Sequence, residues 1–278
     1  MKRCWLIFSF LWIMLPFNII ADNDISMVMY TDKGEIGQLN FASKAISRSC
    51  PTIGFVDQNT KCSCVISCSE VPSSLCNQMR RNIEYSSELG CVLVINGYKP
   101  DCDYLRNEYC SYSQNHKLLY AENPPIDCLS SHLSQWITRG LYSEDDEDEI
   151  RIARPLATSI MLSKYDDLLD KNRLVIIDNS GYIADYKHCI TGSISPARQL
   201  QLQNSIVSND IKDSIESLKQ RIIEILDILE SEETSNIRRY EICLLDHHHA
   251  VECSYEGHLM DKKGQISTFV ESLWKKKS

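Results

Sequence analysis

The order of its predicted strands and helices is the feature that most limits what this chain can fold into. Short apolar or alternating stretches bounded by turn residues are typical of β-strands. These strand groups are separated twice by a pair of helical stretches, which indicates stacked layers of sheets and helices. A four-layer αββα sandwich fits this order, and other α+β folds would fit it too. The predicted strands are residues 26–30, 52–56, 61–67, 90–96, 156–164, 173–178, 182–188, 240–246 and 250–255.

Helical periodicity marks the other segments, because apolar residues recur there every three to four positions. Asp127 follows two prolines, and we expect it to be the N-cap of its helix. The run Asn179-Ser180-Gly181 predicts a tight hairpin turn. The predicted helices are residues 39–47, a stretch that begins at Pro100, 127–138, 194–204, 210–229 and 262–274.

The N-terminal residues differ in character from the rest of the chain. Basic residues at positions 2 and 3 precede an almost wholly apolar run over 5–20, as in a signal peptide. This run is short for a membrane span and is broken by Pro16. We therefore expect a signal-like or extension segment over residues 1–24. No later linker is rich in Gly, Pro or Ser, so residues 25–278 are predicted to form a single domain.

Charge and cysteine content narrow the class of protein. The formal net charge is −9, which disfavours nucleic-acid binding because the chain would repel phosphate. Six of the negative charges are consecutive at 144–149, a pattern typical of a solvated loop. The 13 cysteines follow no repeated spacing, and many lie among apolar residues. This distribution favours reduced, buried thiols over a disulfide framework.

Two short clusters could suggest metal ligands. Cys62, Cys64 and Cys68 would all point to one face of a strand, which favours core packing over a zinc site. The triplet at 247–249 consists of three histidines, but it lies where two strands should turn, so we expect it to face solvent. We predict no metal and no cofactor.

Three blocks, in order and at matching spacings, resemble the proteasome α subunits. The first block, residues 28–46, keeps Gly34 and the helix positions Gln38 and Ala42. The second, 90–109, has an apolar strand, a glycine and an aspartate before a helix. The third, 154–192, is the most specific. It keeps Arg154, Pro155, Asp178, Ser180, Gly181 and Tyr182. Smaller details resemble the alpha type-6 kind.

The resemblance implies a fold and a role. The fold would be the αββα sandwich of the Ntn hydrolases, and the chain would be a non-catalytic subunit of the outer ring of the 20S core. It would gate substrate access in ubiquitin-dependent protein degradation in the cytoplasm and nucleus. Its partners would be other α and β subunits and the regulatory particle, with no nucleic acid, and with no membrane unless the N-terminal apolar segment is real.

The resemblance also implies a few site residues. The pockets that receive the C-terminal tails of regulators usually hold a lysine, and the matching position here is Arg81. The gate and its turn would involve Asp24, Tyr30 and Gly34. Only Asp24 survives from the family's Tyr-Asp-Arg gate motif, so the usual gate contacts are expected to differ.

Two other kinds of protein remain as alternatives. The first is a catalytic threonine hydrolase subunit, whose nucleophile would be a free N-terminal threonine. Thr52 is the nearest candidate, but Cys50 and Pro51 precede it without a Gly-Thr processing junction. Residues 67–69 also stand where a catalytic subunit would have an aspartate. The second alternative is a secreted or lumenal disulfide protein that reuses the fold, which the apolar N-terminus and the many cysteines favour.

Overall fold

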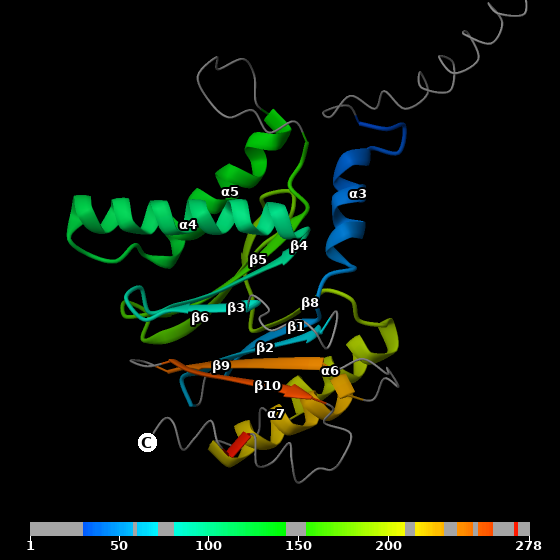
Figure 1. Ribbon diagram of the computed structural model, residues 1–278, viewed down its shortest axis with the longest axis vertical. Helices are drawn as coiled ribbons and strands as arrows, with labels where there is room; N and C mark the ends of the chain where they lie inside the picture. Colours follow the sequence, from blue (N-terminus) through cyan, green and yellow to red (C-terminus); the bar gives the residue numbers. More distant parts are fainter. Residues whose placement is uncertain are drawn as a thin grey trace, which may run out of the picture.

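The structure is a computed structural model with two β-sheets stacked face to face and helices on both outer sides (Figure 1). It describes residues 30–57, 60–71, 81–142, 154–208, 215–230, 238–246, 250–257 and 270–271. The layers therefore follow the order helices, sheet, sheet, helices, as the predicted αββα sandwich requires. The gate residue Asp24 and the histidine triplet at 247–249 lie outside the described residues.

The first sheet contains five strands in the order β10-β9-β2-β1-β8. All of its pairings are antiparallel, and Gly54 of β1 lies opposite Val65 of β2. Its strands are β1 (Thr52–Asp57), β2 (Cys62–Glu70), β8 (His188–Thr191), β9 (Arg238–Leu245) and β10 (Ala250–Gly257).

The second sheet also contains five strands, in the order β3-β4-β5-β6-β7. Consecutive strands pair antiparallel throughout, so this sheet is a meander. Its strands are β3 (Ile83–Ser86), β4 (Cys91–Gly97), β5 (Thr158–Asp166), β6 (Lys171–Ile177) and β7 (Ile183–Asp185). The predicted apolar strand at 90–96 is β4, with six of its seven residues buried.

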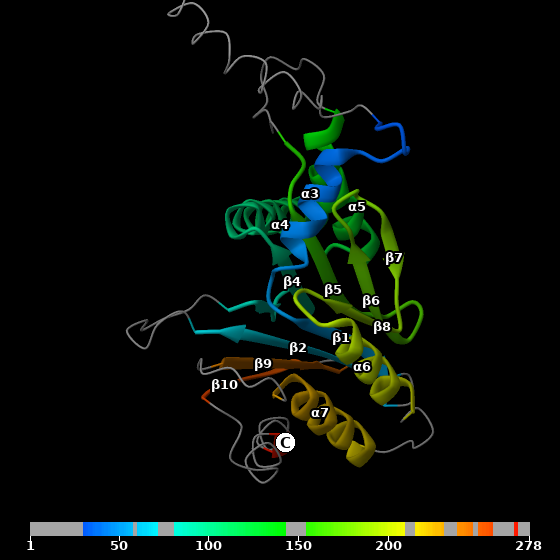
Figure 2. The ribbon, with the colours of Figure 1, turned by 90° about the vertical axis from the view of Figure 1, so that its right-hand side faces the viewer.

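Two helix pairs cover the outer faces of the sheets (Figure 2). The helices α4 (Lys99–Tyr120) and α5 (Ile126–Tyr142) cover the second sheet, where Leu105, Leu129 and Leu133 pack on β4 and β5 residues. The helices α6 (Pro196–Ser208) and α7 (Ile215–Glu230) cover the first sheet.

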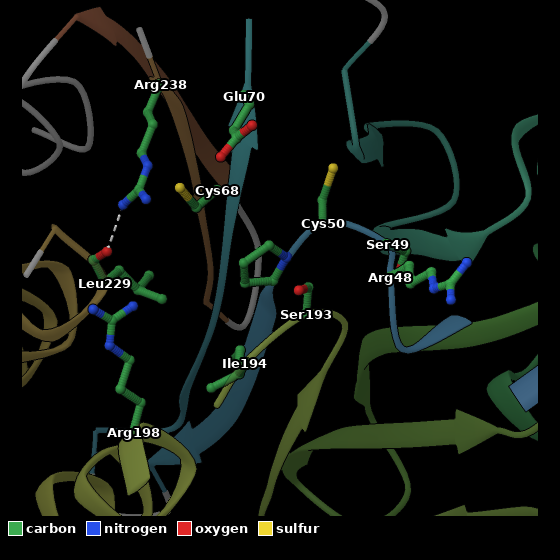
Figure 3. A pocket seen from close by; sticks show the side chains of 11 residues that line it. Arg48, Ser49, Cys50, Cys68, Glu70, Ser193, Ile194, Arg198, Leu229 and Arg238 are labelled. Carbon is green, nitrogen blue, oxygen red and sulfur yellow. Dashed lines mark hydrogen bonds between the residues drawn. The ribbon is translucent and has the colours of Figure 1, made fainter. Parts of the chain in front are cut away.

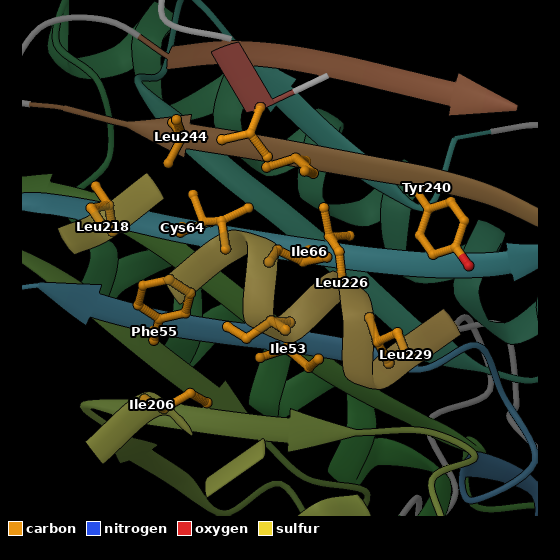
Figure 4. Close-up of a cluster of buried hydrophobic side chains, with 14 of the residues drawn as sticks. Ile53, Phe55, Cys64, Ile66, Ile206, Leu218, Leu226, Leu229, Tyr240 and Leu244 are labelled. Atoms are coloured by element: carbon orange, nitrogen blue, oxygen red, sulfur yellow. The ribbon is translucent and has the colours of Figure 1, made fainter. Parts of the chain in front are cut away.

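The core under α6 and α7 contains the three cysteines singled out in the sequence. Cys62, Cys64 and Cys68 lie in one buried cluster with Ile53, Ile66 and the apolar stripe of α7. Figure 4 shows the part of this cluster around Cys64. Alternation along β2 places these thiols on the face toward the helices, as the strand pattern predicts. Each thiol therefore fills space in a packed core, in agreement with the predicted core packing.

A third cluster lies between the two sheets. Val65 and Cys243 of the first sheet pack there against Val92, Met161 and Leu174 of the second. One polar pair crosses the same interface, where the hydroxyls of Ser63 and Ser163 are 2.7 Å apart. Both strand faces of each sheet are thus buried, which explains why the central strands are nearly continuous apolar runs.

One helix, α3 (Gly37–Ile46), stands apart from these two pairs (Figure 1). It precedes β1 in the chain and packs against β4 and β5. Its buried residue is Ala42, while Phe41 on the neighbouring position is exposed. A small side chain at position 42 lets the helix approach the sheet closely.

Some sequence predictions were wrong. The predicted strand at 182–188 is really two strands, β7 and β8, which belong to different sheets. Tyr186 donates its backbone N–H to Leu174 of the second sheet, whereas Lys187 accepts from Val56 of the first. Asp127 is not an N-cap, because α5 begins at Ile126 and Asp127 lies inside the first turn.

Other predicted boundaries shifted or could not be compared. Strand β3 was missed, because it has only four residues and only one of them, Ile83, is buried. The hairpin turn at 179–181 was correct and joins β6 to β7. The predicted strand at 26–30 lies outside the described residues except for its last position. The same holds for the predicted terminal helix at 262–274, apart from residues 270–271, and for the first positions of the predicted helix at 210–229.

Candidate functional site

A buried polar cluster occupies the point where β1 begins. Thr52, the first residue of β1, is fully buried, and its hydroxyl lies 3.3 Å from both the Ser67 hydroxyl and the Asn96 side-chain oxygen. Asn96 in turn donates from its amide nitrogen to the Thr191 hydroxyl at 2.7 Å. These residues come from β1, β2, β4 and β8, so the cluster joins the two sheets at one end.

A carboxylate extends this cluster toward β3. Glu241 of β9 accepts hydrogen bonds from the backbone N–H groups of Asn82 and Ile83, at 2.8 and 3.0 Å. It also forms an ion pair with Arg239 at 3.0 Å. The Asn82 side chain then donates to Ser67, which completes the connection to Thr52. A buried carboxylate needs such partners, since an unpaired one would cost several kcal/mol.

The surroundings of Thr52 do not activate its hydroxyl. A threonine becomes a nucleophile when a neighbouring base takes its proton, and in N-terminal threonine enzymes that base is the free α-amine. The nitrogen of Thr52 is an amide, because Pro51 precedes it, and the Pro51 carbonyl accepts a backbone bond from Cys68. The Asn96 oxygen and the Ser67 hydroxyl are weak bases. The cluster therefore has the geometry of a structural network.

A cavity of about 300 Å³ lies beside this cluster, between the start of β1 and the ends of α6 and α7 (Figure 3). Its size is at the lower end of ordinary small-molecule sites. Its charged lining residues are Arg48, Glu70, Arg198 and Arg238, and the remaining ones are Ser49, Cys50, Pro51, Cys68, Ser193, Ile194 and Leu229.

The charges around this cavity are partly compensated within the fold. Arg238 donates to the carbonyl of Leu229 at 2.7 Å, near the negative end of the α7 dipole. Glu70 lies directly opposite Arg238 in the β2–β9 ladder. Burial raises the pKa of the Cys50 thiol, which keeps it neutral and unreactive. The cavity is thus a mixed-charge recess without an activated nucleophile.

The turn between β6 and β7 connects two helices. Asn179 donates to the Leu39 carbonyl and to the Ser43 hydroxyl of α3, both at 3.0 Å. On its other side, Ser134 of α5 donates to the Gly181 carbonyl at 2.6 Å. The turn itself is closed by Asp178, whose carboxylate accepts from the backbone N–H groups of residues 180 and 182. This turn therefore fixes α3 against the sandwich.

Comparison with known proteins agrees with this architecture. The family described as "Proteasome subunit" matches residues 58–245. The chain belongs to the proteasome subunit family. It is also 29% identical over 170 residues to the "Probable proteasome subunit alpha type-5" of Encephalitozoon cuniculi (strain GB-M1). That alignment covers 60% of this chain and 69% of the relative.

The proteasome family match accounts for the fold, and the relative supports a subunit of the alpha type. This similarity supports, in general terms, a non-catalytic role in the α ring. The internal position of Thr52 in the chain agrees with such a role. The comparisons do not confirm the alpha type-6 likeness. Within the described residues, the structure holds no helix that is both long and apolar enough to cross a membrane.

The sequence-predicted site residues fall in three places. Arg154 and Pro155 lie just before β5, where Arg154 pairs with Asp101 of α4. A second group lies in the β6–β7 turn and the helix α3 beside it, and Asn179 of the turn is hydrogen-bonded to that helix. The turn residues are Asp178, Ser180, Gly181 and Tyr182, and the helix residues are Gln38 and Ala42. Gly34 closes the 31–34 turn at φ +75°, and Tyr30 bridges to Ile36. Arg81 is an exposed side chain beside Asn82. Their proposed roles stay predictions.

Sequence reasoning missed Glu241 and Asn96. Glu241 occupies a strand position that an acidic residue usually takes only when it faces solvent. The signal that could have helped is the short apolar run at residues 242–245 that follows it in β9, which is typical of a strand buried on both faces.

Proposed function

We propose that this chain is a non-catalytic subunit of the outer α ring of a 20S proteasome core particle. One observation carries the proposal: Thr52 opens the first core strand with its nitrogen in a peptide bond and its hydroxyl fully buried. The name of the E. cuniculi relative supports the alpha type. Peptide hydrolysis would then be carried out by β-type partners, which supply the free N-terminal threonine.

The segment before β1 would act at the pore. In this proposal the turn at 31–34 and α3 line the ring, and the residues before them control the access of unfolded, ubiquitin-marked substrates. Support comes from the way α3 is held, since Asn179 binds it while Tyr30 and Phe41 remain exposed. An exposed aromatic side chain on a fixed helix suits contact with a neighbouring subunit.

The finer assignments belong to the same proposal. Arg81 would attract the C-terminal carboxylate of a regulatory particle, since a guanidinium binds carboxylates in two-point fashion. The working compartments would be cytoplasm and nucleus. The ring position would be that of the alpha type-6 subunit, on the motifs near residues 44–46 and 154–156. The likeness to an alpha type-5 subunit makes that position the natural competitor.

Native purification tests the role. A C-terminally tagged chain is expressed in its own cells and purified without denaturant, and the partners are identified by mass spectrometry. We expect a particle of proteasome size that contains other α and β subunits and cleaves peptides. Cross-linking to the adjacent subunits then separates the type-5 from the type-6 position. Recovery of the chain alone, or from the secretory pathway with oxidised cysteines, would contradict the proposal.

A threonine substitution tests the lack of catalysis. The variant Thr52→Ala should enter the particle and leave its peptide hydrolysis unchanged, apart from any loss caused by weaker folding. The matched variant Thr191→Ala removes the other threonine hydroxyl of the same cluster and controls for that loss. Loss of one peptidase activity in Thr52→Ala alone, at equal incorporation, would identify Thr52 as a nucleophile.

A further inference from the structure

Aromatic and histidine side chains meet along the seam between α4 and α5. His132 of α5 stacks on Tyr112 of α4, with ring centroids 4.0 Å apart and an interplanar angle of 18°. Trp136 lies one turn further along α5 and meets Tyr104 of α4 edge to face at 5.7 Å. His116 extends the series beside Tyr112 at 6.0 Å. These five residues, which we call the seam cluster, are half-buried.

A hydrogen bond within this cluster defines the protonation state of His132. The indole Nε1–H of Trp136 lies 3.0 Å from Nε2 of His132. An indole nitrogen can only donate, so Nε2 of His132 must accept and carries no proton. His132 is therefore a neutral imidazole with its proton on Nδ1. A proton added to Nε2 would place two N–H groups against each other and abolish the bond.

Charge in the neighbourhood opposes the protonated form. Arg139, one turn beyond Trp136 on α5, lies over the indole ring at 3.9 Å. From α4, the titratable groups that face this part of the seam are Tyr104, Tyr112 and His116, and Cys128 of α5 lies near Tyr112. Burial first and the Arg139 charge second lower the pKa of His132 below its usual 6.5.

We propose that the His132–Trp136 hydrogen bond is a proton-sensitive latch, which opens when His132 takes up a proton and loosens the seam between α4 and α5. The consequence for assembly rests on the proposed function and on the added premise that this helix pair faces the adjacent β ring. Acid would then weaken the contact between rings at this subunit. The device is local, since it needs only one imidazole, one indole and the stacked Tyr112.

The direction of the pH effect follows from linkage. The folded chain favours the neutral imidazole, so it binds fewer protons at this site than the unfolded chain. The stabilisation by His132 is therefore complete above pH 6.5, the usual pKa, and is lost as the pH falls through the lowered folded value. The latch should stay closed at neutral pH and open only in acid.

Trp136 fluorescence in the full-length chain tests the latch directly. The emission difference between the wild type and Trp136→Phe isolates the signal of this indole from the other tryptophans. We expect one transition with a midpoint below pH 6.5. His132→Gln offers a non-titrating acceptor and should lose the transition. His132→Phe keeps an aromatic ring on Tyr112 without an acceptor, so its emission at neutral pH should resemble that of the wild type in acid.

A neighbouring histidine supplies the matched control. His116→Gln removes another imidazole of the seam cluster and should leave the transition in place. A transition that persists in His132→Gln, or that disappears in His116→Gln, would overturn the proposal. So would an imidazole pKa of His132 at or above 6.5 when measured by NMR.

Assembly is measured separately, so that the two proposals can fail independently. The fluorescence transition reports the latch whether or not the chain joins a particle. Native mass analysis of purified particles from neutral to acidic pH then compares wild type with His132→Gln. If the wild-type particle dissociates at a higher pH than the His132→Gln particle, the consequence for assembly is supported. If both dissociate at the same pH, it is contradicted. If no particle is recovered, the proposed function is contradicted. The latch is then judged from the fluorescence transition alone.

Discussion

The carboxylate of Asp101 accepts hydrogen bonds from both terminal nitrogens of the Arg154 guanidinium, at 2.7 and 2.8 Å. It also accepts the backbone N–H of Ala157 at 2.9 Å. Asp101 lies in the first turn of α4, where a negative charge also complements the helix dipole. One buried carboxylate thus joins the start of α4 to the segment that leads into β5. The Arg-Pro pair at 154–155 therefore has a structural role, at the entry to β5, the central strand of the second sheet.

Neutralising that carboxylate should weaken the fold. We expect Asp101→Asn to lower the free energy of unfolding by about 2–3 kcal/mol, because the two-point contact with Arg154 loses its charge and one acceptor. Urea denaturation followed by circular dichroism measures the change. Asp167→Asn makes the same chemical change at an exposed position and should stay within about 0.5 kcal/mol. Equal effects of the two variants would contradict the role of the pair.

Much of the fold follows from apolar patterning alone. Strands such as β4 and β6 are runs of branched apolar residues, and only a sheet covered on both faces buries them. The division between β7 and β8 could not be predicted in the same way. The chain bends at residue 187 between the two strands, but residues 183–191 contain no glycine or proline to mark the point of change. The switch depends on which backbone partner is within reach, Leu174 or Val56.

The candidate site was less accessible to sequence reasoning than the fold. Thr52 could be placed in a core strand because its neighbours match an apolar strand pattern. The contact from Glu241 to Asn82, by contrast, joins residues 159 positions apart. No local pattern reports such a pairing, since a single glutamate within a strand usually faces water. Buried polar partners of this kind become visible only once the two sheets are stacked.

Adding a methyl group at Gly181 should disturb the turn that holds α3 and α5. The residue has φ +82°, and a Cβ atom there would lie 2.4 Å from Cγ2 of Thr138. Gly34 provides a matched control, with φ +75° and open space around it. Gly34→Ala should cost about 1 kcal/mol of left-handed strain. Gly181→Ala should cost roughly 1–3 kcal/mol more through overpacking.

Shortening the opposing side chain gives a further check on Gly181. Thr138→Ser removes the methyl group that a new Cβ would meet, while it keeps a hydroxyl for the bond to the Ser134 carbonyl. The double variant with Gly181→Ala should therefore recover part of the loss in urea denaturation. If Gly181→Ala and Gly34→Ala cost the same, the close packing of the turn under α5 is wrong.

Buried thiols should react slowly with an alkylating reagent in the native chain. Burial raises the pKa of Cys91 to about 11. At pH 8 about one molecule in a thousand would then carry the reactive thiolate. The buried Cys64 has its pKa raised in the same way. Exposed Cys110 and Cys128 should be alkylated first by iodoacetamide in the native chain, with Cys64 and Cys91 following only in urea.

Mass spectrometry of tryptic peptides follows that alkylation site by site. Cys128→Ser should lose the early label at position 128 only, and should leave the label at Cys110 and the two late ones unchanged. No disulfide joins two of the described cysteines, so those late sites should become fully labelled in urea without a reductant. Labels that appear only after reduction would instead favour the secreted, disulfide-containing alternative.

The hydroxyl pair between the sheets should show strong coupling. Ser63 of β2 and Ser163 of β5 are both buried, and each hydroxyl is the partner that the other needs. Removing one leaves the other unpaired in the core, so Ser63→Ala and Ser163→Ala should each cost about 1–3 kcal/mol. The double variant should cost clearly less than their sum, because it leaves no unpaired hydroxyl. Ser111→Ala, on the exposed side of α4, should change the free energy of unfolding by less than about 0.5 kcal/mol. Additive losses would mean that the two sheets do not bring these hydroxyls together, and the stacking on which the αββα assignment depends would then be wrong at its centre.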